Sequence, residues 1–293
     1  MAKYLSKEQR TVLVKFLAYL GLVRWYNLFL IALAQYLAVF FVLEHVHTWQ
    51  SVLANPGLHF LVFSSGLIIA GGYLVNAFYD QEKDLANNPN RLIIGRVISK
   101  GFALNTYLLF TVTGVLIGYL LSWQVSLFYA VFAFLLWFYS HKLKKITFIG
   151  NLVASLLSIC SFFVICVYYK QINTIIIMYV VFILLLELVR QIIKDMEAIR
   201  GDLLFGYQTL PVRIGLKKTK TVLYLLMLLG VFPVGYVFIR IEGVLLYFLS
   251  VAILVMLLCS VLLVFARRKQ QFEQINNILK VLIVFGVVSL ALF

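Results

Sequence analysis

The chain has 293 residues, of which 63% are hydrophobic and 12% are charged, and its mean hydropathy is +1.02. A soluble domain of this length needs far more polar residues to cover its surface, so the composition excludes one. The formal net charge of +14 would suit a nucleic-acid partner, but the basic residues are distributed as membrane topology requires, and no nucleic-acid partner is expected.

Residues 1–23 are expected to form a segment at the membrane surface. The stretch from Thr11 to Val23 is amphipathic, which is typical of a helix that lies along the interface. The start of the chain is basic, and no small-residue cleavage site follows an apolar core. A cleaved signal peptide is therefore not expected.

Nine apolar runs follow, and several approach or exceed the roughly 20 residues that a helix needs to cross a bilayer. Each run must satisfy its own backbone hydrogen bonds in lipid, and the runs are continuous where a β-barrel would alternate. We therefore predict an all-α fold, a polytopic membrane bundle of nine transmembrane helices in which residues 1–293 form a single domain. The spans are expected near 24–44, 58–79, 102–121, 124–141, 147–169, 172–193, 221–239, 243–266 and 277–293.

The basic residues are almost all on one side of these spans. Of the 25 Lys and Arg residues, 23 lie in or beside the N-terminal segment and the loops after spans two, four, six and eight, whereas only Lys170 and Arg240 lie on the opposite side. The positive-inside rule makes the basic side cytoplasmic. We expect an integral protein of the cytoplasmic (inner) membrane with a cytoplasmic N-terminus and contact with anionic membrane lipid.

The connections after spans two and six are the long ones, at about 80–101 and 194–220. Both begin with polar residues at helical spacing, which predicts that these two spans continue as helices beyond the bilayer. Seven of the eleven carboxylates lie in two clusters at these span ends, within residues 80–84 and 187–202.

The first acidic cluster closes span two. A helix advances by about 100° per residue, so Asn76, Asp80 and Asp84 share one face at intervals of one turn. In the second cluster, after span six, Asp195 and Asp202 are seven residues apart and again share a face.

Carboxylates on one helix face at a membrane boundary repel each other unless a positive group joins them. Their hard oxygens suit Mg²⁺, which takes one or two carboxylates and completes its shell with phosphate oxygens and water. Two such clusters could hold a diphosphate through bridging ions. The alternative is that each cluster is only a solvated helix end. Two clusters at span ends on the same side favour the metal site.

Three motifs carry a resemblance to a known family. They are Asn76…Asp80…Asp84…Asn88-Pro89-Asn90-Arg91, Tyr139-Ser140…Lys142-Leu143-Lys144…Gly150-Asn151, and Lys194-Asp195…Gly201-Asp202…Gly206…Thr209-Leu210-Pro211. In this order, with Arg24 and Asn27 at the entry to the first span, the chain resembles the UbiA-type intramembrane prenyltransferases over most of its length.

The resemblance implies an activity and a cofactor. In that family the two acidic motifs bind Mg²⁺ and a polyprenyl diphosphate in a cavity between helices that opens to lipid. The implied metal ligands are Asn76, Asp80, Asp84, Asp195 and Asp202, and the implied catalytic residues are the same four aspartates with Tyr139. Asn76 would also contact the diphosphate. The chain departs from the pattern at Ala77 and Ala198, where the family usually has acids, so each cluster has one carboxylate fewer.

Basic residues near the motifs are candidates for diphosphate contacts, namely Arg91, Lys144 and Arg190. For each, a role in topology or lipid contact is the alternative, and Arg190 is spaced to pair with Glu187 one turn away. The ring or hydroxyl of Tyr139 could steady a cation or bind a phosphate, although interfacial tyrosines are common.

The pattern around the second motif is similar to members that use long, geranylgeranyl-type donors and make archaeal-type glyceryl ether lipids. The lipid-like acceptor would then be the hydroxyl of a prenylglyceryl phosphate. Prenylation of an aromatic quinone or chlorin precursor is the alternative within the family. A lipid or ion transporter is the alternative from another class, but transporters place charges near the bilayer midplane, where this chain has almost none.

Overall fold

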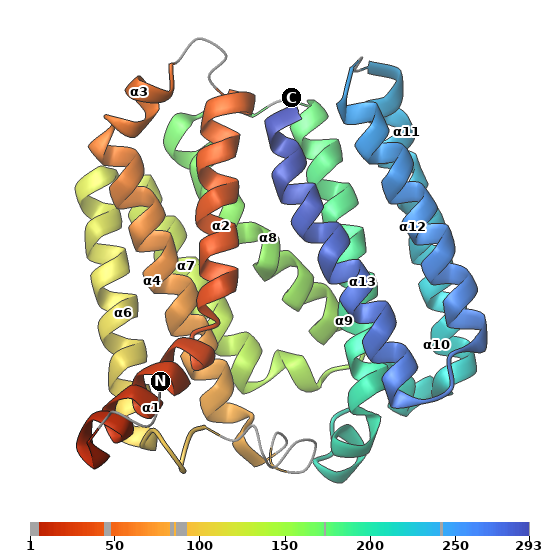
Figure 1. Cartoon of the computed structure of the whole chain (residues 1–293), viewed down its shortest axis with the longest axis horizontal. Helices are drawn as coiled ribbons and strands as arrows, with labels where there is room; N and C mark the ends of the chain where they lie inside the picture. The colour runs from red at the N-terminus through yellow and green to blue at the C-terminus, as the bar shows by residue number, and fades with distance from the viewer. Residues whose placement is uncertain are drawn as a thin grey trace. The chain divides into compact units, whose positions relative to one another are not determined.

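A computed structural model describes residues 6–43, 48–82, 85, 93–172, 174–240 and 243–292. Over these ranges the apolar runs are helical, because a helix satisfies its own backbone hydrogen bonds. Nine helices of the described chain are long and apolar enough to cross a membrane (Figure 1). The prediction of an all-α bundle with nine transmembrane helices is confirmed.

The N-terminal segment forms a separate helix, α1 (Lys7–Leu22). The Ser6 hydroxyl accepts the amide of Gln9, and the Gln9 side chain accepts the amide of Ser6, which is a capping box. Arg24 has a φ of +52°, and this left-handed residue separates α1 from α2 (Trp25–Leu37). Apolar side chains such as Val12 and Phe16 are exposed on α1, which supports an interfacial position for it.

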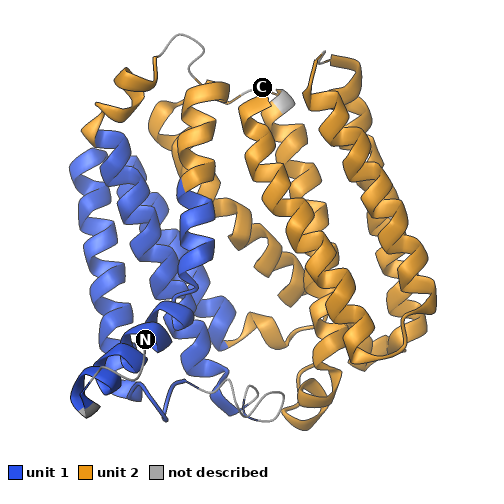
Figure 2. Cartoon of the chain, viewed as in Figure 1, with its two compact units in different colours: residues 1–32, 57–141 blue, residues 33–56, 142–293 orange. Residues whose placement is uncertain are grey.

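The chain divides into two compact units, coloured in Figure 2. The first contains residues 1–32 and 57–141, and the second contains residues 33–56 and 142–293. The expectation of one domain over residues 1–293 stays a prediction.

The first unit is built on three long helices, α4 (Pro56–Tyr79), α6 (Lys100–Leu121) and α7 (Trp123–His141). The buried Tyr129 hydroxyl on α7 lies 2.9 Å from the Leu61 carbonyl and 3.0 and 2.9 Å from the hydroxyls of Ser64 and Ser65. Since buried polar groups are costly unless they are hydrogen-bonded, this network fixes how α7 sits on α4.

Close approach of α6 and α7 requires a glycine. A Cβ atom at Gly118 would lie 2.7 Å from Cδ2 of Tyr129, whereas a Cβ at Gly66 of α4 would meet no atom within 4 Å. We expect Gly118→Ala to lower the free energy of unfolding by about 1–3 kcal/mol through overpacking. The matched Gly66→Ala variant should be neutral or stabilising, because alanine is the better helix former. Thermal unfolding in detergent measures both, and equal effects would contradict this account.

The second unit is arranged around α9 (Thr174–Leu204), which packs against α8, α10, α11 and α13. The Tyr179 hydroxyl of α9 contacts the Ser289 hydroxyl and the Gly286 carbonyl, which ties α9 to the end of the chain. The end of α2, from Leu33 to Leu37, belongs to this unit, as do the π-helix η2 (Ala38–Leu43) and the short α3 (Trp49–Leu53). The other helices are α8 (Ile149–Tyr169), α10 (Leu210–Leu229), α11 (Val231–Arg240), α12 (Leu245–Phe265), α13 (Lys269–Val288) and η5 (Ser289–Leu292).

Several expected helix boundaries were wrong. The continuation of span six beyond residue 193 is confirmed, since α9 runs without a break to Leu204. The connection expected at 194–220, however, comprises only residues 205–209. The charged residues that suggested a loop lie on the exposed side of α10, whose Leu210 and Thr219 are buried. A residue with φ of +78°, Gly215, kinks this helix. The last span begins at Lys269 and not near 277, and span two is interrupted by a turn at Asp80.

Candidate active site

The first acidic motif stands at the end of α4. The Asp80 amide donates to the Asn76 carbonyl at 3.0 Å, so the two residues are one helical turn apart, and both are half-buried. The Ser140 hydroxyl of α7 lies 3.5 Å from Oδ1 of Asn76, although its shorter bond, 2.8 Å, goes to the Leu136 carbonyl. The remaining predicted members, Asp84 and Arg91, lie outside the described residues.

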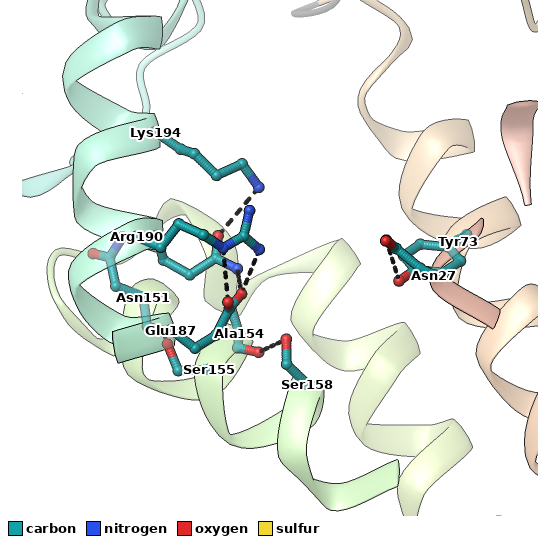
Figure 3. A network of polar contacts seen from close by, with 10 residues as sticks. Asn27, Tyr73, Asn151, Ala154, Ser155, Ser158, Glu187, Arg190 and Lys194 are labelled. Carbon is teal, nitrogen blue, oxygen red and sulfur yellow. Dashed lines mark hydrogen bonds and ion pairs between the residues drawn. The ribbon is translucent and has the colours of Figure 1, made fainter. Parts of the chain in front are cut away.

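The residues at the start of α2 contact α4 one turn before this motif. The Asn27 amide donates to the Tyr73 hydroxyl at 3.0 Å (Figure 3). The Arg24 guanidinium lies 5.0 Å from the centroid of the Tyr73 ring. A cation over an aromatic face is attractive. Sequence reasoning identified Arg24 and Asn27 but missed Tyr73, which gives both of them a common partner.

Tyr139 and Ala77, two positions that the sequence singled out, lie in the first unit. Tyr139 is half-buried on the last turn of α7, next to Ser140. Ala77, which replaces the family's usual acid, packs against an apolar cluster that includes Leu22 and Leu74. An aspartate at this position would therefore bring a carboxylate against apolar side chains, which is unfavourable.

The second motif begins on the last three turns of α9, which carry its two aspartates, and continues through the turn into α10. Oδ2 of Asp195 accepts the side-chain amide of the buried Asn151 on α8 at 2.6 Å. Asp202 is fully buried, and its Oδ2 accepts the hydroxyl of Thr209 at 3.0 Å. Each predicted aspartate of α9 thus accepts a hydrogen bond from a neutral donor in another part of the chain.

Arg190 lies on α9, nearer the middle of the helix than Asp195, and forms an ion pair with Glu187. Its Nε and Nη2 atoms donate to the two carboxylate oxygens of Glu187, both at 2.7 Å, and Gln191 donates to the same carboxylate at 2.6 Å (Figure 3). Lys194 contacts Oε1 of Gln191 at 3.4 Å. The pairing of Glu187 with Arg190 that helical spacing suggested is confirmed, and a contact from Arg190 to diphosphate stays a prediction.

Lys144 is buried in a short 3-10 helix, η4 (Leu143–Lys145), after α7. A Cβ atom at Gly150 would lie 2.9 Å from the Lys144 carbonyl oxygen, so only glycine fits where α8 passes this turn. The role of Lys144 as a diphosphate contact stays a prediction.

The η4 turn is also tied to the turn that follows α9. The Gln208 amide donates to the Lys145 carbonyl at 3.0 Å, the Thr147 hydroxyl donates to the Gln208 carbonyl, and the Lys145 ammonium lies 5.5 Å from the centroid of the Tyr207 ring. Lys145, Tyr207 and Thr209 were not predicted as site residues. Thr209 was quoted only as part of a motif, and no sequence spacing relates Lys145 to Tyr207.

The hydrogen bond between Thr209 and Asp202 has a testable effect on stability. We expect Thr209→Val to lower the free energy of unfolding by about 1.5–3 kcal/mol, because the valine leaves a fully buried carboxylate without this donor. Thr209→Ser keeps the hydroxyl and should retain most of the stability. Thermal unfolding of the two variants tests this, and indistinguishable stabilities would show that the hydrogen bond contributes little.

The donor chemistry of these residues fits Mg²⁺. The predicted ligands offer carboxylate and amide oxygens, which a hard cation prefers, and they include no thiol or imidazole. Among the described residues, no group of three His, Cys, Asp or Glu side chains is arranged so that it could hold a metal ion. Asp84, one of the five predicted ligands, is not among them.

These features define an integral α-helical membrane protein with acidic and amide side chains near the ends of two helices. A family model described as the UbiA prenyltransferase family matches residues 36–279, and the chain belongs to this family. It is therefore a prenyltransferase, as the sequence predicted.

Curated relatives match over most of their length. A digeranylgeranylglyceryl phosphate synthase from Sulfurisphaera tokodaii is 31% identical over 255 residues, covering 82% of this chain and 87% of the relative. One from Methanosphaera stadtmanae is 27% identical and covers 89% and 94%.

Solved structures share the fold. A structure described in a study of digeranylgeranylglyceryl phosphate synthase in membranes has a TM-score of 0.67 at 22% identity, covering 95% of this chain and 98% of that one. A UbiA homologue from Archaeoglobus fulgidus, bound to GPP and Mg²⁺, has a TM-score of 0.65 at 15% identity, covering 94% and 100%.

Proposed function

We propose that this prenyltransferase moves a geranylgeranyl-type group from its diphosphate to the hydroxyl of a prenylglyceryl phosphate, forming an ether lipid. The observation that carries the proposal is the arrangement on α9, where Asp195 and Asp202 are two turns apart and are held by Asn151 and Thr209. The names of the curated relatives support the choice of acceptor.

Asn76, Asp80, Asp84, Asp195 and Asp202 would hold Mg²⁺, as oxygen ligands of the kind this ion takes. When bound, the ion would supply positive charge to the diphosphate oxygens. The Mg²⁺-bound state of a fold neighbour supports this assignment. The chain's own part is to keep the carboxylates oriented, through the hydrogen bonds from Asn151 to Asp195 and from Thr209 to Asp202.

The reaction breaks the bond between the allylic carbon and the diphosphate oxygen, and the diphosphate leaves with the electron pair. The acceptor hydroxyl oxygen then bonds to that carbon and releases its proton. Stabilising the charge of the departing diphosphate lowers the barrier. We assign this role to the two acidic motifs, with Arg91, Lys144 and Arg190 as candidate diphosphate contacts. Tyr139 is the candidate to steady the cation through its ring or to hydrogen-bond a phosphate. Apolar surroundings would limit capture of the cation by water.

We also propose that both motifs and the N-terminus face the cytoplasm. The support is the distribution of 23 basic residues against two.

The test is an acceptor panel. The full chain in proteoliposomes receives labelled geranylgeranyl diphosphate, Mg²⁺ and, separately, geranylgeranylglyceryl phosphate or aromatic quinone precursors, and the products are identified by mass spectrometry. We expect an ether product with the glyceryl phosphate alone. A prenylated aromatic product would replace the proposed acceptor, and no product with any acceptor would overturn the proposal.

A further inference from the structure

Residues 145–151, which we call the brace, run from the end of η4 into the first turn of α8. At the end of the brace, Asn151 donates to the carboxylate of Asp195 on α9 at 2.6 Å. Four residues earlier, the Thr147 hydroxyl donates to the Gln208 carbonyl in the turn that follows α9. One short segment therefore bonds both to α9 and to the turn after it.

Gln208 lies between two residues that bond to Asp202. On one side, the amide of the buried Tyr207 donates to the Asp202 carbonyl at 2.9 Å. On the other side, the Thr209 hydroxyl donates to Oδ2 of Asp202 at 3.0 Å. The amide of Gln208 donates to the Lys145 carbonyl at 3.0 Å, so the brace bonds to both backbone groups of Gln208. A displacement of Gln208 from the brace would therefore disturb the hydrogen bond that holds the Asp202 carboxylate.

The brace contains a strained backbone turn at Phe148. This residue has φ of +62° and ψ of −41°, and the Ile149 amide donates to the Thr147 carbonyl at 2.7 Å. These are the features of a γ-turn with a left-handed central residue, a rare and strained conformation for a residue that has a Cβ atom. The Phe148 side chain is exposed and makes no capping hydrogen bond to α8, so its own contacts do not explain the turn.

Backbone strain of this kind persists where the surrounding structure imposes it, and it is concentrated at ligand-binding and catalytic sites. In the brace, the strained residue separates the two that bond to the second motif. Thr147 precedes the turn and contacts Gln208, and Asn151 follows it and contacts Asp195. The turn therefore allows both contacts to form from a single segment.

We propose that Thr147 is a positioning residue that acts through Gln208 to hold the carboxylate of Asp202 in place for cation binding. Asn151 does the same for Asp195 from the other end of the brace, so one segment orients both carboxylates of the motif. The proposal rests on the proposed function, in which these two aspartates hold Mg²⁺. Since Mg²⁺ demands a near-ideal octahedral arrangement of its ligands, a misplaced carboxylate weakens its binding.

The first test is the Mg²⁺ requirement of the full chain in proteoliposomes. Thr147→Val keeps the shape of the side chain and removes its hydroxyl. We expect the Mg²⁺ concentration for half-maximal diphosphate release to rise about threefold to tenfold, with the rate at saturating Mg²⁺ nearly unchanged. Thr147→Ser should restore the wild-type requirement. Thr221→Val is the matched control, because the exposed Thr221 hydroxyl contacts only the Lys217 carbonyl of its own helix among the described bonds.

A second readout is independent of catalysis. Hydrogen–deuterium exchange of a peptide that contains the Tyr207 and Gln208 amides should be about threefold to tenfold faster in Thr147→Val. Exchange of this peptide should be unchanged in Thr147→Ser and in Thr221→Val. The backbone turn is tested in the same way, since Phe148→Gly can keep a positive φ and should preserve slow exchange. Phe148→Pro, whose ring holds φ near −65°, should accelerate it.

The outcomes distinguish this proposal from the proposed function. Unchanged exchange and an unchanged Mg²⁺ requirement in Thr147→Val would overturn the positioning role while leaving the prenyltransferase reaction intact. Faster exchange with an unchanged Mg²⁺ requirement would show a purely structural contact and would also overturn it. A wild-type protein that releases diphosphate equally well without Mg²⁺ would instead overturn the metal site of the proposed function, and the role of Thr147 in cation binding with it.

Discussion

Replacing Asp202 with asparagine should lower the rate of diphosphate release about a hundredfold to a thousandfold while leaving the protein folded. The asparagine side-chain oxygen can still accept the hydroxyl of Thr209, so the buried contact survives. The negative charge that would hold the cation, and through it stabilise the leaving group, is lost. Release of labelled diphosphate from geranylgeranyl diphosphate measures the effect, alongside thermal unfolding of the same sample.

The rate of diphosphate release and the unfolding temperature together distinguish a catalytic role of Asp202 from a purely structural one. A purely structural aspartate would give a variant whose unfolding temperature falls while its rate per folded molecule stays near that of the wild type. That result would remove Asp202 from the proposed site. Thr209→Val is the control, because it removes the hydrogen bond to Asp202 without changing a charge.

The second large effect is expected at the contact between Asn151 and Asp195. Asp195→Asn should reduce diphosphate release as strongly as Asp202→Asn, and Asn151→Ala should reduce it about tenfold to a hundredfold, which is the usual cost of removing a residue that orients a metal ligand. The reason is geometric, since the 2.6 Å hydrogen bond from Asn151 fixes the carboxylate of Asp195. Steady-state kinetics at several Mg²⁺ concentrations should show that Asn151→Ala requires more Mg²⁺ for half-maximal rate.

Ser155 offers a matched control on the same helix. Its hydroxyl donates to the backbone carbonyl of Asn151 at 2.8 Å and not to a carboxylate. Ser155→Ala should therefore leave the Mg²⁺ requirement unchanged. If it shifts that requirement as much as Asn151→Ala does, the effect comes from packing of α8 and not from the orientation of Asp195.

Most of the fold could be predicted because lipid leaves the backbone few options. Long apolar runs must be helices, so hydropathy alone located all nine transmembrane helices. It failed where charged residues lie on the exposed side of a helix. Arg213 and Lys217 made the start of α10 look like a loop, and Lys269 hid the start of α13. The kink at Gly215 depends on one backbone angle, which hydropathy does not report.

For the candidate site, the sequence predicted only contacts and shared faces between residues of the same helix. Spacing of 3.6 residues per turn placed Asp195 and Asp202 on one face of α9, and it paired Glu187 with Arg190. Contacts between segments far apart in the chain have no such signal. Neither the bond from Asn151 to Asp195 nor the link between Asn27 and Tyr73 follows from spacing, because each depends on how two helices pack.

The most direct measurement of the central claim is the binding of a non-reactive donor, geranylgeranyl thiolodiphosphate, by calorimetry with and without Mg²⁺. We predict that tight binding requires Mg²⁺ and is lost in Asp80→Asn, Asp195→Asn and Asp202→Asn. Thermal unfolding curves must show that each of these variants is folded. Binding of equal strength in EDTA and in all three variants would contradict the claim that these aspartates hold the diphosphate through the metal.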